Sequence, residues 1–170
     1  MTDIVFLHQK KLTEPQHKVT KISSFAEVWE YPTTGNKSLH ASVTFIPDEV
    51  ISTFVPKEIL NEPNYLTVQL NEQEHIMLAP EFLQYINHSC NPNVFFNTTN
   101  LVVICLRRIE VGEEMTFFYP STEWCMAQTF DCNCKTQKCL GRIQGALYLH
   151  PTILQTYKLS DYIKQKLEKL

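Results

Sequence analysis

A polar, turn-forming block at residues 87–93 constrains the fold of this chain more than any other feature. It reads Asn-His-Ser-Cys-Asn-Pro-Asn and lies between an apolar run ending at Ile86 and the β-rich run Val94-Phe95-Phe96. Asn residues hydrogen-bond their own backbone in turns and Pro presets φ, so the block predicts a tight, rigid turn. A His and a Cys are therefore expected at the end of a strand, held together in one place.

Two further motifs follow this block along the chain. Residues 112–119 read Gly-Glu-Glu-Met-Thr-Phe-Phe-Tyr, a glycine turn followed by a strand-like run. Residues 132–139 contain three cysteines with the spacing Cys-x-Cys-x4-Cys. Taken alone, this spacing leaves both a metal site and ordinary or redox-active thiols open, because it lacks the paired Cys-x2-Cys of a zinc ribbon.

Together the three motifs resemble those of the SET-domain protein methyltransferases with a post-SET zinc segment. They occur in the family's order, and the resemblance covers about residues 38–145. It implies a mainly β SET-domain (β-clip) fold of several short sheets, with a threaded C-terminal segment, a post-SET zinc site and a C-terminal helix. It also divides the chain into an N-terminal extension (1–35), a SET domain (36–120), a post-SET zinc segment (121–145) and a helical tail (146–170).

Apolar periodicity and turn residues predict the individual elements. Strands are expected at 4–7, 26–31, 39–46, 50–55, 94–96, 101–106 and 115–119, with a hairpin formed by 65–70 and 75–78. The run 101–106 is continuously apolar, which predicts a strand buried on both faces. Helical turns are expected at 57–61, 80–86 and 123–127. Ser160 is expected to cap an amphipathic helix with Ile163, Leu167 and Leu170 on one side.

The resemblance assigns four cysteines to a structural Zn²⁺ ion. Cys132, Cys134 and Cys139 come from the cysteine segment, and Cys90 comes from the turn block. Four thiolates close a tetrahedral site and leave no open position for catalysis. The metal would therefore act mechanically, by pinning the C-terminal segment onto the turn block.

The resemblance also implies methyl transfer from S-adenosylmethionine to a lysine amine. An unperturbed lysine, with a pKa of about 10.4, costs roughly 4 to 5 kcal/mol to deprotonate at pH 7. Such an enzyme therefore needs a dry channel that positions the neutral amine. Tyr119 matches the family's catalytic tyrosine, whose hydroxyl directs the amine lone pair. Without the resemblance, Tyr119 would be interpreted as a tyrosine flanking the core.

Two phenylalanines precede this tyrosine. Phe117, on the same strand face as Tyr119, matches the position where Phe is associated with di- or trimethylation and Tyr with monomethylation. Phe118 stands where many family members have Asp. The expectation is therefore a catalytic pair, Tyr119 and Phe117, that adds more than one methyl group.

The residues expected to bind the cofactor come from separate segments. Asn87 and His88 match residues that hold the adenosyl part, although a polar turn beneath a zinc site also explains them. The family's Gly-x-Gly-Leu-Phe-Ala turn corresponds to residues 36–41, which contain no glycine. This departure matters because glycine permits close approach of the backbone to a ligand. The expected cofactor-binding set is Lys37, Ser38, Leu39, Asn87, His88, Tyr119 and Leu140, with Phe54 as a channel aromatic.

Composition limits the partners and the compartment. The 170 residues fit one globular domain, with 44% hydrophobic and 19% charged residues. A net charge of -3 and the lack of a long basic run argue against a direct nucleic-acid partner. With no apolar run of about 18 residues and no signal-peptide pattern, a soluble, intracellular protein without a membrane partner is expected, either cytoplasmic or nuclear. In a reducing compartment Cys105 is expected to be buried, and Cys125 exposed and free.

The expected function is S-adenosylmethionine-dependent methylation of a lysine in an unidentified protein. Two alternatives stay open. The missing glycines suggest a catalytically inactive binding module with a SET fold, and a methyltransferase acting on a small molecule or peptide uses the same chemistry. A zinc-stabilised nucleic-acid binder is disfavoured by the acidic charge balance.

Overall fold

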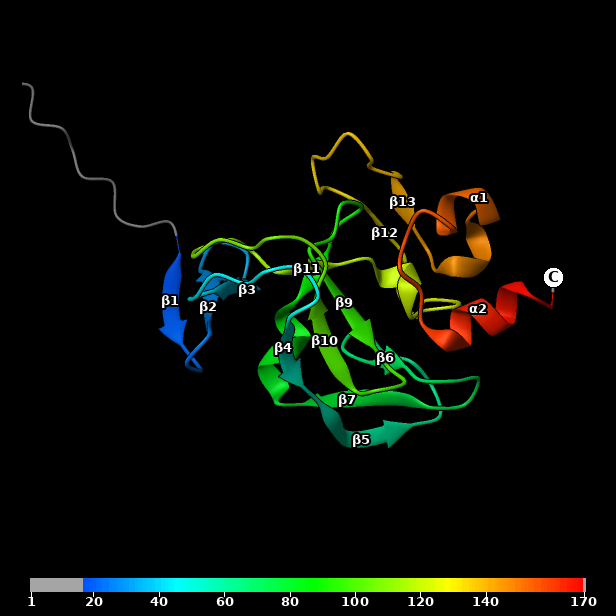
Figure 1. The fold of residues 1–170 in the computed structure, drawn as a ribbon, viewed down its shortest axis with the longest axis horizontal. Coiled ribbons are helices and arrows are strands. Elements are labelled where there is room, and N and C mark those ends of the chain that lie inside the picture. Colours follow the sequence, from blue (N-terminus) through cyan, green and yellow to red (C-terminus); the bar gives the residue numbers. More distant parts are fainter. Residues whose placement is uncertain (1–16, 170) are drawn as a thin grey trace, which may run out of the picture.

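Five small sheets carry most of the regular structure in the computed structural model, which describes residues 17–169 (Figure 1). The three-stranded sheets are β1 (Lys18–Lys21), β2 (Ala26–Tyr31) and β3 (Asn36–Ala41); β4 (Val50–Thr53), β10 (Val102–Cys105) and β9 (Val94–Asn97); and β5 (Val55–Leu60), β7 (His75–Ala79) and β6 (Val68–Gln69). The two-stranded sheets pair β8 (Asn87–His88) with β11 (Thr116–Phe117) and β12 (Phe130–Asp131) with β13 (Arg142–Ile143). The prediction of a mainly β fold of several short sheets is confirmed.

Short helices connect these sheets and cover one end of the molecule. The 3-10 helices are η1 (Glu81–Tyr85), η2 (Tyr119–Ser121) and η3 (Ala146–Tyr148), and the α-helices are α1 (Pro151–Leu154) and α2 (Asp161–Leu167). Figure 1 places the β1–β2–β3 sheet at one end of the molecule and α1 and α2 at the other. Among the helices of the described residues, none combines the length and apolar character that a bilayer crossing requires.

The turn block and the second motif lie side by side. β8 pairs with β11 in parallel, with Asn87 opposite Thr116 and His88 opposite Phe117. Beyond the strand, the Ser89 and Asn93 amides donate to the carbonyls of Phe117 and Thr116, both at 3.0 Å. The second motif therefore lies against the turn block from Asn87 to Asn93, and the chain then continues into the C-terminal segment.

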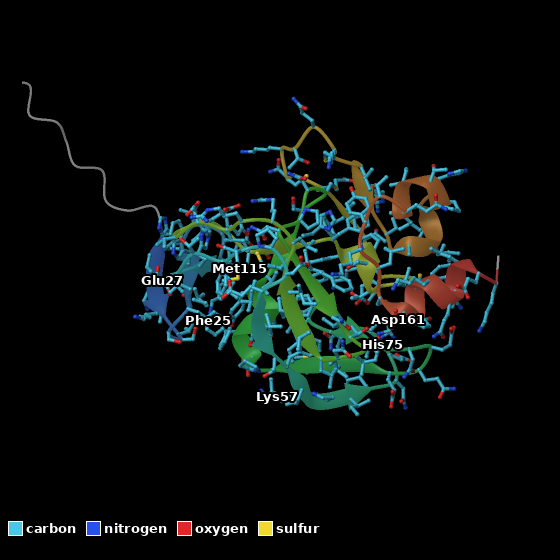
Figure 2. The ribbon with its side chains drawn as sticks, in the orientation of Figure 1. Phe25, Glu27, Lys57, His75, Met115 and Asp161 are labelled. Carbon is cyan, nitrogen blue, oxygen red and sulfur yellow. The ribbon has the colours of Figure 1, made fainter. Side chains whose placement is uncertain are left out.

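Two apolar cores stabilise this arrangement. The larger core contains Leu39, Phe96 and Met115, which are fully buried. Met115 connects the first sheet to the centre of the molecule, since its amide donates to the Leu39 carbonyl at 2.8 Å and Figure 2 shows it beside that sheet. The smaller core lies under the C-terminal tail and consists of Phe118, Ala146, Leu154, Leu159 and Ile163.

Within the described residues the C-terminal tail packs as the sequence predicts, and Leu170, also predicted on the apolar side, lies outside them. Ser160 caps α2, because its Oγ accepts a hydrogen bond from the Ile163 amide at 3.3 Å. Ile163 is fully buried, and Leu167 packs against the smaller core. Phe118 stacks on Tyr157 with ring centroids 3.7 Å apart. The apolar residue before Tyr119 thus holds the tail in place.

Two predicted helical turns are wrong. Residues 57–61 fall largely in β5, because the backbone of 55–60 pairs with β7 and this tertiary pairing overrides the local helix propensity. Residues 123–127 are irregular because their amides bond to other segments. The Trp124 amide donates to Gln69 Oε1 at 2.9 Å and the Met126 amide to the Gln144 carbonyl at 2.9 Å. The turn expected at 80–86 is confirmed as η1.

Several predicted strands differ in extent. The run 101–106 is half-buried, since Val103 and Cys105 face the core while Val102 and Ile104 are partly exposed. The strand expected at 39–46 ends at Ala41, and that expected at 50–55 is divided between β4 and β5. The 65–70 and 75–78 hairpin is confirmed, although its first strand shortens to β6, and the strand expected at 115–119 shortens to β11. The run 4–7 lies outside the described residues.

Candidate functional site

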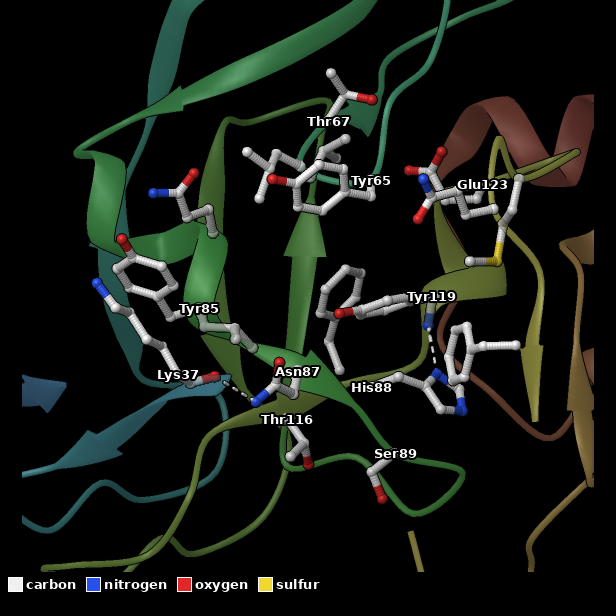
Figure 3. Close-up of a pocket in the computed structure, with 18 of the residues that line it drawn as sticks. Lys37, Tyr65, Thr67, Tyr85, Asn87, His88, Ser89, Thr116, Tyr119 and Glu123 are labelled. Atoms are coloured by element: carbon white, nitrogen blue, oxygen red, sulfur yellow. Dashed lines mark hydrogen bonds between the residues drawn. The ribbon is translucent and has the colours of Figure 1, made fainter. Parts of the chain in front are cut away.

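A pocket of about 990 Å³ brings the three motifs together (Figure 3). Its volume is at the upper end of the range that ligand sites usually occupy, about 300 to 1,000 Å³. The lining includes Asn87 and His88 from the turn block, Tyr119 from the second motif, and Cys134 from the cysteine segment. Residues far apart in the chain therefore form one concave site.

Tyr119 lies in an aromatic wall of this pocket. Its ring centroid is 4.6 Å from that of Phe117, 5.2 Å from that of His88 and 5.9 Å from that of Phe130. Phe117 lies in turn 4.6 Å from Phe96. No residue of the described range hydrogen-bonds the Tyr119 hydroxyl, which leaves that group available to a ligand.

The Tyr119 hydroxyl keeps its proton at neutral pH. Burial, reinforced by the nearby carboxyls of Glu123 and Glu114, raises its pKa well above the ordinary value of 10.0. A tyrosine in this state is a poor base, but its oxygen accepts hydrogen bonds and its proton can be donated. Tyr119 can therefore position a polar group that enters the aromatic wall.

The side chains of Asn87 and His88 are held by internal hydrogen bonds. Asn87 Nδ2 donates to the Lys37 carbonyl at 3.0 Å and to Glu114 Oε1 at 2.9 Å. His88 Nδ1 accepts from the Tyr119 amide at 3.2 Å, and burial lowers the His88 pKa to about 4, so the ring is neutral at pH 7. Dashed lines in Figure 3 mark the bonds of Asn87 to Lys37 and of His88 to Tyr119, which hold the two side chains at the floor of the pocket.

The other predicted cofactor residues are only partly gathered here. Lys37 lines the pocket, and its Nζ lies 5.4 Å from the centre of the Tyr85 ring. Ser38 and Leu39 are buried in β3, where Ser38 Oγ lies 2.9 Å from His40 Nε2, and neither lines the pocket. Leu140 is also outside the lining. Cofactor contacts of these three residues stay predictions.

The channel aromatic expected at Phe54 lies elsewhere. Phe54 is 1% exposed and its ring packs 5.5 Å from that of Phe96 in the larger core, outside the pocket lining. Tyr65 and Tyr85, which were not among the predicted site residues, line the pocket instead. Tyr85 lies just before the turn block, whereas Tyr65 comes from a segment without a motif and is brought to the site by the tertiary structure.

Glu123 is another pocket residue that no sequence pattern identified. Its side chain is 7% exposed, and burial raises its pKa to about 7. It follows Tyr119 by four residues, but the predicted helical turn at 123–127 gave no reason to place it in a pocket. Glu114, by contrast, stands inside the second motif, and its Oε1 accepts a hydrogen bond from Asn87 Nδ2.

Four cysteines form a cluster at the edge of the pocket. The Sγ atoms of Cys90, Cys132, Cys134 and Cys139 all lie within 4.8 Å of one another, and those of Cys90 and Cys132 are 3.8 Å apart. A tetrahedral zinc site with Zn–S bonds of about 2.3 Å has its sulfurs about 3.8 Å apart. The donor set and its spacing therefore fit a zinc ion with four thiolate ligands.

The two remaining cysteines lie where the sequence predicts. Cys105 is fully buried in β10, and its Sγ donates to the Arg107 carbonyl at 2.8 Å. Cys125 is exposed and forms no disulfide. Neither belongs to the four-cysteine cluster.

Comparison with known proteins defines the class. The family model of the SET domain matches residues 6–120, more than half of the chain. The chain therefore belongs to the SET domain family, in agreement with its mainly β fold of several small sheets.

Individual relatives carry methyltransferase names. Methyltransferase flvH of Aspergillus flavus is 39% identical over 119 residues, which cover 69% of this chain and 65% of flvH. Histone-lysine N-methyltransferase 2B of Homo sapiens is 36% identical over 62 residues, 33% of this chain and 2% of that protein. The H3 lysine-36 specific histone-lysine N-methyltransferase of Saccharomyces cerevisiae is 25% identical over 103 residues, 57% of this chain and 14% of the yeast protein. The chain thus spans less than two thirds of each of these relatives.

Proposed function

We propose that this protein is an S-adenosylmethionine-dependent methyltransferase that transfers methyl groups to the side-chain amine of a lysine in a protein. The observation that carries the proposal is the Tyr119 hydroxyl, unbonded by the described residues, in an aromatic-walled pocket of a SET-domain chain. An aromatic, poorly hydrated wall favours the neutral form of an amine. Tyr119 would hold that amine through its oxygen, and Phe117 beside it would leave room for more than one methyl group.

The proposed cofactor site uses the pocket floor. S-adenosylmethionine would supply the methyl group as a sulfonium donor. Asn87 and His88 would contact it through the backbone and the faces left open by their internal bonds, with Lys37 at the rim. Tyr119 in the pocket wall, together with Ser38, Leu39 and Leu140, completes the proposed set, although the last three do not line the pocket in this structure.

The proposed metal site is the cysteine cluster, as a post-SET zinc centre. Cys90, Cys132, Cys134 and Cys139 would hold a structural Zn²⁺ ion, consistent with the spacing of their sulfurs. Cys132 and Cys134 also line the pocket. The residues of this cluster would then stabilise one wall of the cofactor site.

The test uses labelled S-adenosylmethionine. Purified protein is incubated with the labelled cofactor and a protein array, and mass spectrometry locates the label. Methylated lysines are expected. Cofactor binding without label transfer to any target would instead support the inactive binding module, and no binding at about 1 mM would remove the cofactor from the proposal.

A second candidate substrate is a small amine. The observation that favours it is the match to flvH, whose name specifies a methyltransferase but no protein substrate. That match is aligned over 119 residues, whereas the match to the human histone enzyme is aligned over 62. A screen of free amino acids and alkylamines with labelled cofactor separates the two candidates. Label on a small amine with none on protein would assign the small-molecule activity.

A further inference from the structure

Glu123 is a buried carboxyl group in the pocket, and the proposed transfer mechanism does not use it. Its side chain is 7% exposed, yet it lines the same pocket as Tyr119. Figure 3 shows the two residues on the same side of that pocket. Carboxyl groups are rarely buried without a partner, so this position needs a physical explanation.

Only one carboxyl oxygen of Glu123, Oε1, forms hydrogen bonds with the described residues. Oε1 accepts from the Gln69 amide at 2.9 Å and from Thr122 Oγ1 at 3.0 Å. No described residue hydrogen-bonds Oε2, and Oε2 is not among the polar atoms that are both sealed from solvent and unpartnered. The carboxyl group is therefore held in a fixed orientation by one oxygen while the other is open to the pocket.

No cation of the described residues neutralises this carboxylate. None of the ion pairs of residues 17–169 includes Glu123. The nearby Lys166 pairs with Glu72 at 2.9 Å instead, and its Nζ lies 5.1 Å from the centre of the Trp124 ring. The pocket thus contains an oriented acceptor that lacks a positively charged donor.

We propose that Glu123 binds the positively charged amino group of the amine substrate through Oε2. The inference rests on the proposed function, because it names the group that recognises the amine before transfer. An ammonium group supplies both the charge and the hydrogen-bond donors that the carboxylate lacks, and such charge-assisted bonds are the strong ones. A purely structural role, in which Glu123 holds residues 122–124 against β6, would need only the contacts of Oε1 and would leave Oε2 without a function.

The test compares binding of n-butylamine, which is protonated at pH 7.5 and resembles a lysine side chain, with binding of 1-butanol. Both are titrated into the whole protein and followed by protein-detected NMR at matched concentrations. The wild type is expected to prefer the amine by about tenfold or more. Glu123→Gln keeps the shape and the Oε1 acceptor, and it is expected to abolish that preference. Glu58→Gln, which removes an exposed carboxylate, is the matched control and is expected to retain it.

A pH series on the wild type keeps the inference testable should Glu123→Gln fail to fold. Since Glu123 titrates near pH 7, amine affinity is expected to rise between pH 6 and pH 8 while alcohol affinity stays constant. Around Glu123, burial raises the pKa values of the tyrosines and lowers that of the histidine, and the remaining two residues form an ion pair. These groups are Tyr119, Tyr162, His75, and the pair of Glu72 and Lys166.

The outcomes distinguish this inference from the proposed function. An amine preference that survives in Glu123→Gln, or a wild type that shows no preference and no pH response, overturns the role of Glu123. Loss of methyl transfer to every target, with the Glu123-dependent amine preference intact, overturns the proposed enzyme activity and leaves the amine site standing.

Discussion

At the scale of single residues, Tyr119 is the position on which the proposed transfer depends. Tyr119→Phe removes only the hydroxyl oxygen, so the aromatic wall with Phe117 and His88 is expected to persist. Methyl transfer should fall by about a hundredfold or more, because a positioned polar group at the reacting centre is lost. Calorimetry should show that the variant still binds the cofactor, because the ring of Tyr119 is retained. Tyr148→Phe, at an exposed tyrosine, is the control, and retained activity in Tyr119→Phe would remove the hydroxyl from the mechanism.

Phe117 packs beside Tyr119, and we expect it to control how much space lies there. The two ring centroids are 4.6 Å apart, so a hydroxyl added at residue 117 would enter the space beside the amine or order a water molecule there. We expect Phe117→Tyr to shift the product from di- or trimethylated toward monomethylated amine. Mass spectrometry of the product after long incubation measures this, and an unchanged product distribution would contradict the expectation.

Glu123 makes the stability of the fold depend on pH in the direction opposite to that of most carboxyl groups. Burial raises its pKa from 4.5 to about 7, so the folded state favours the protonated form. Its contribution is present below the unfolded pKa and is lost as pH rises through about 7. Glu123→Gln should therefore gain stability relative to wild type between pH 5 and pH 8, by up to about 3 kcal/mol at roughly 1.4 kcal/mol per unit. Denaturant titrations of both proteins at the two pH values measure this gain.

At the scale of elements, local patterns predicted what local interactions determine. The cap at Ser160 and the turn at 80–86 depend on neighbouring residues, and both were readable from the sequence. The helical turns predicted at 57–61 and 123–127 were wrong because the hydrogen-bond partners of these segments, β7 and Gln69, lie outside the local sequence. The site divides in the same way, since the family motifs identified Asn87 and Tyr119, while Glu123 enters the pocket only through its bond to β6.

The α2 cap gives a prediction at this scale. Ser160→Ala leaves the Ile163 amide without its partner at the start of the helix, next to a fully buried side chain. The expected loss is about 1 kcal/mol, or a decrease of roughly 2 to 4 °C in Tm for a chain of this size. Ser160→Asp keeps an acceptor oxygen and should stay near the wild-type Tm. Equal losses in both variants would mean that packing and not capping determines the effect.

At the scale of the whole molecule, three kinds of contact hold the C-terminal segment against the turn block and the second motif. The Tyr157 hydroxyl donates to the Cys90 carbonyl at 2.8 Å, and the Leu140 amide donates to Cys90 Sγ at 3.4 Å. Phe118 stacks on Tyr157 from the other side. The cysteine cluster is the third contact, and it joins the turn block to the pocket wall at residues 132–134, where His88 also packs 5.5 Å from the ring of Phe130.

Removing a ligand of the proposed zinc ion should therefore affect metal content and cofactor binding together. Cys134→Ser is expected to lose zinc, because three thiolates bind it far more weakly than four. Since Tyr157 and Phe118 still hold the tail, the chain should stay folded while the wall at 132–134 loosens and cofactor affinity falls. Metal analysis, circular dichroism and calorimetry follow the three quantities, with Cys125→Ser as the control at an exposed cysteine outside the cluster. Wild-type protein without zinc, or a Cys134→Ser variant that keeps full cofactor affinity, would show that the pocket forms independently of the metal.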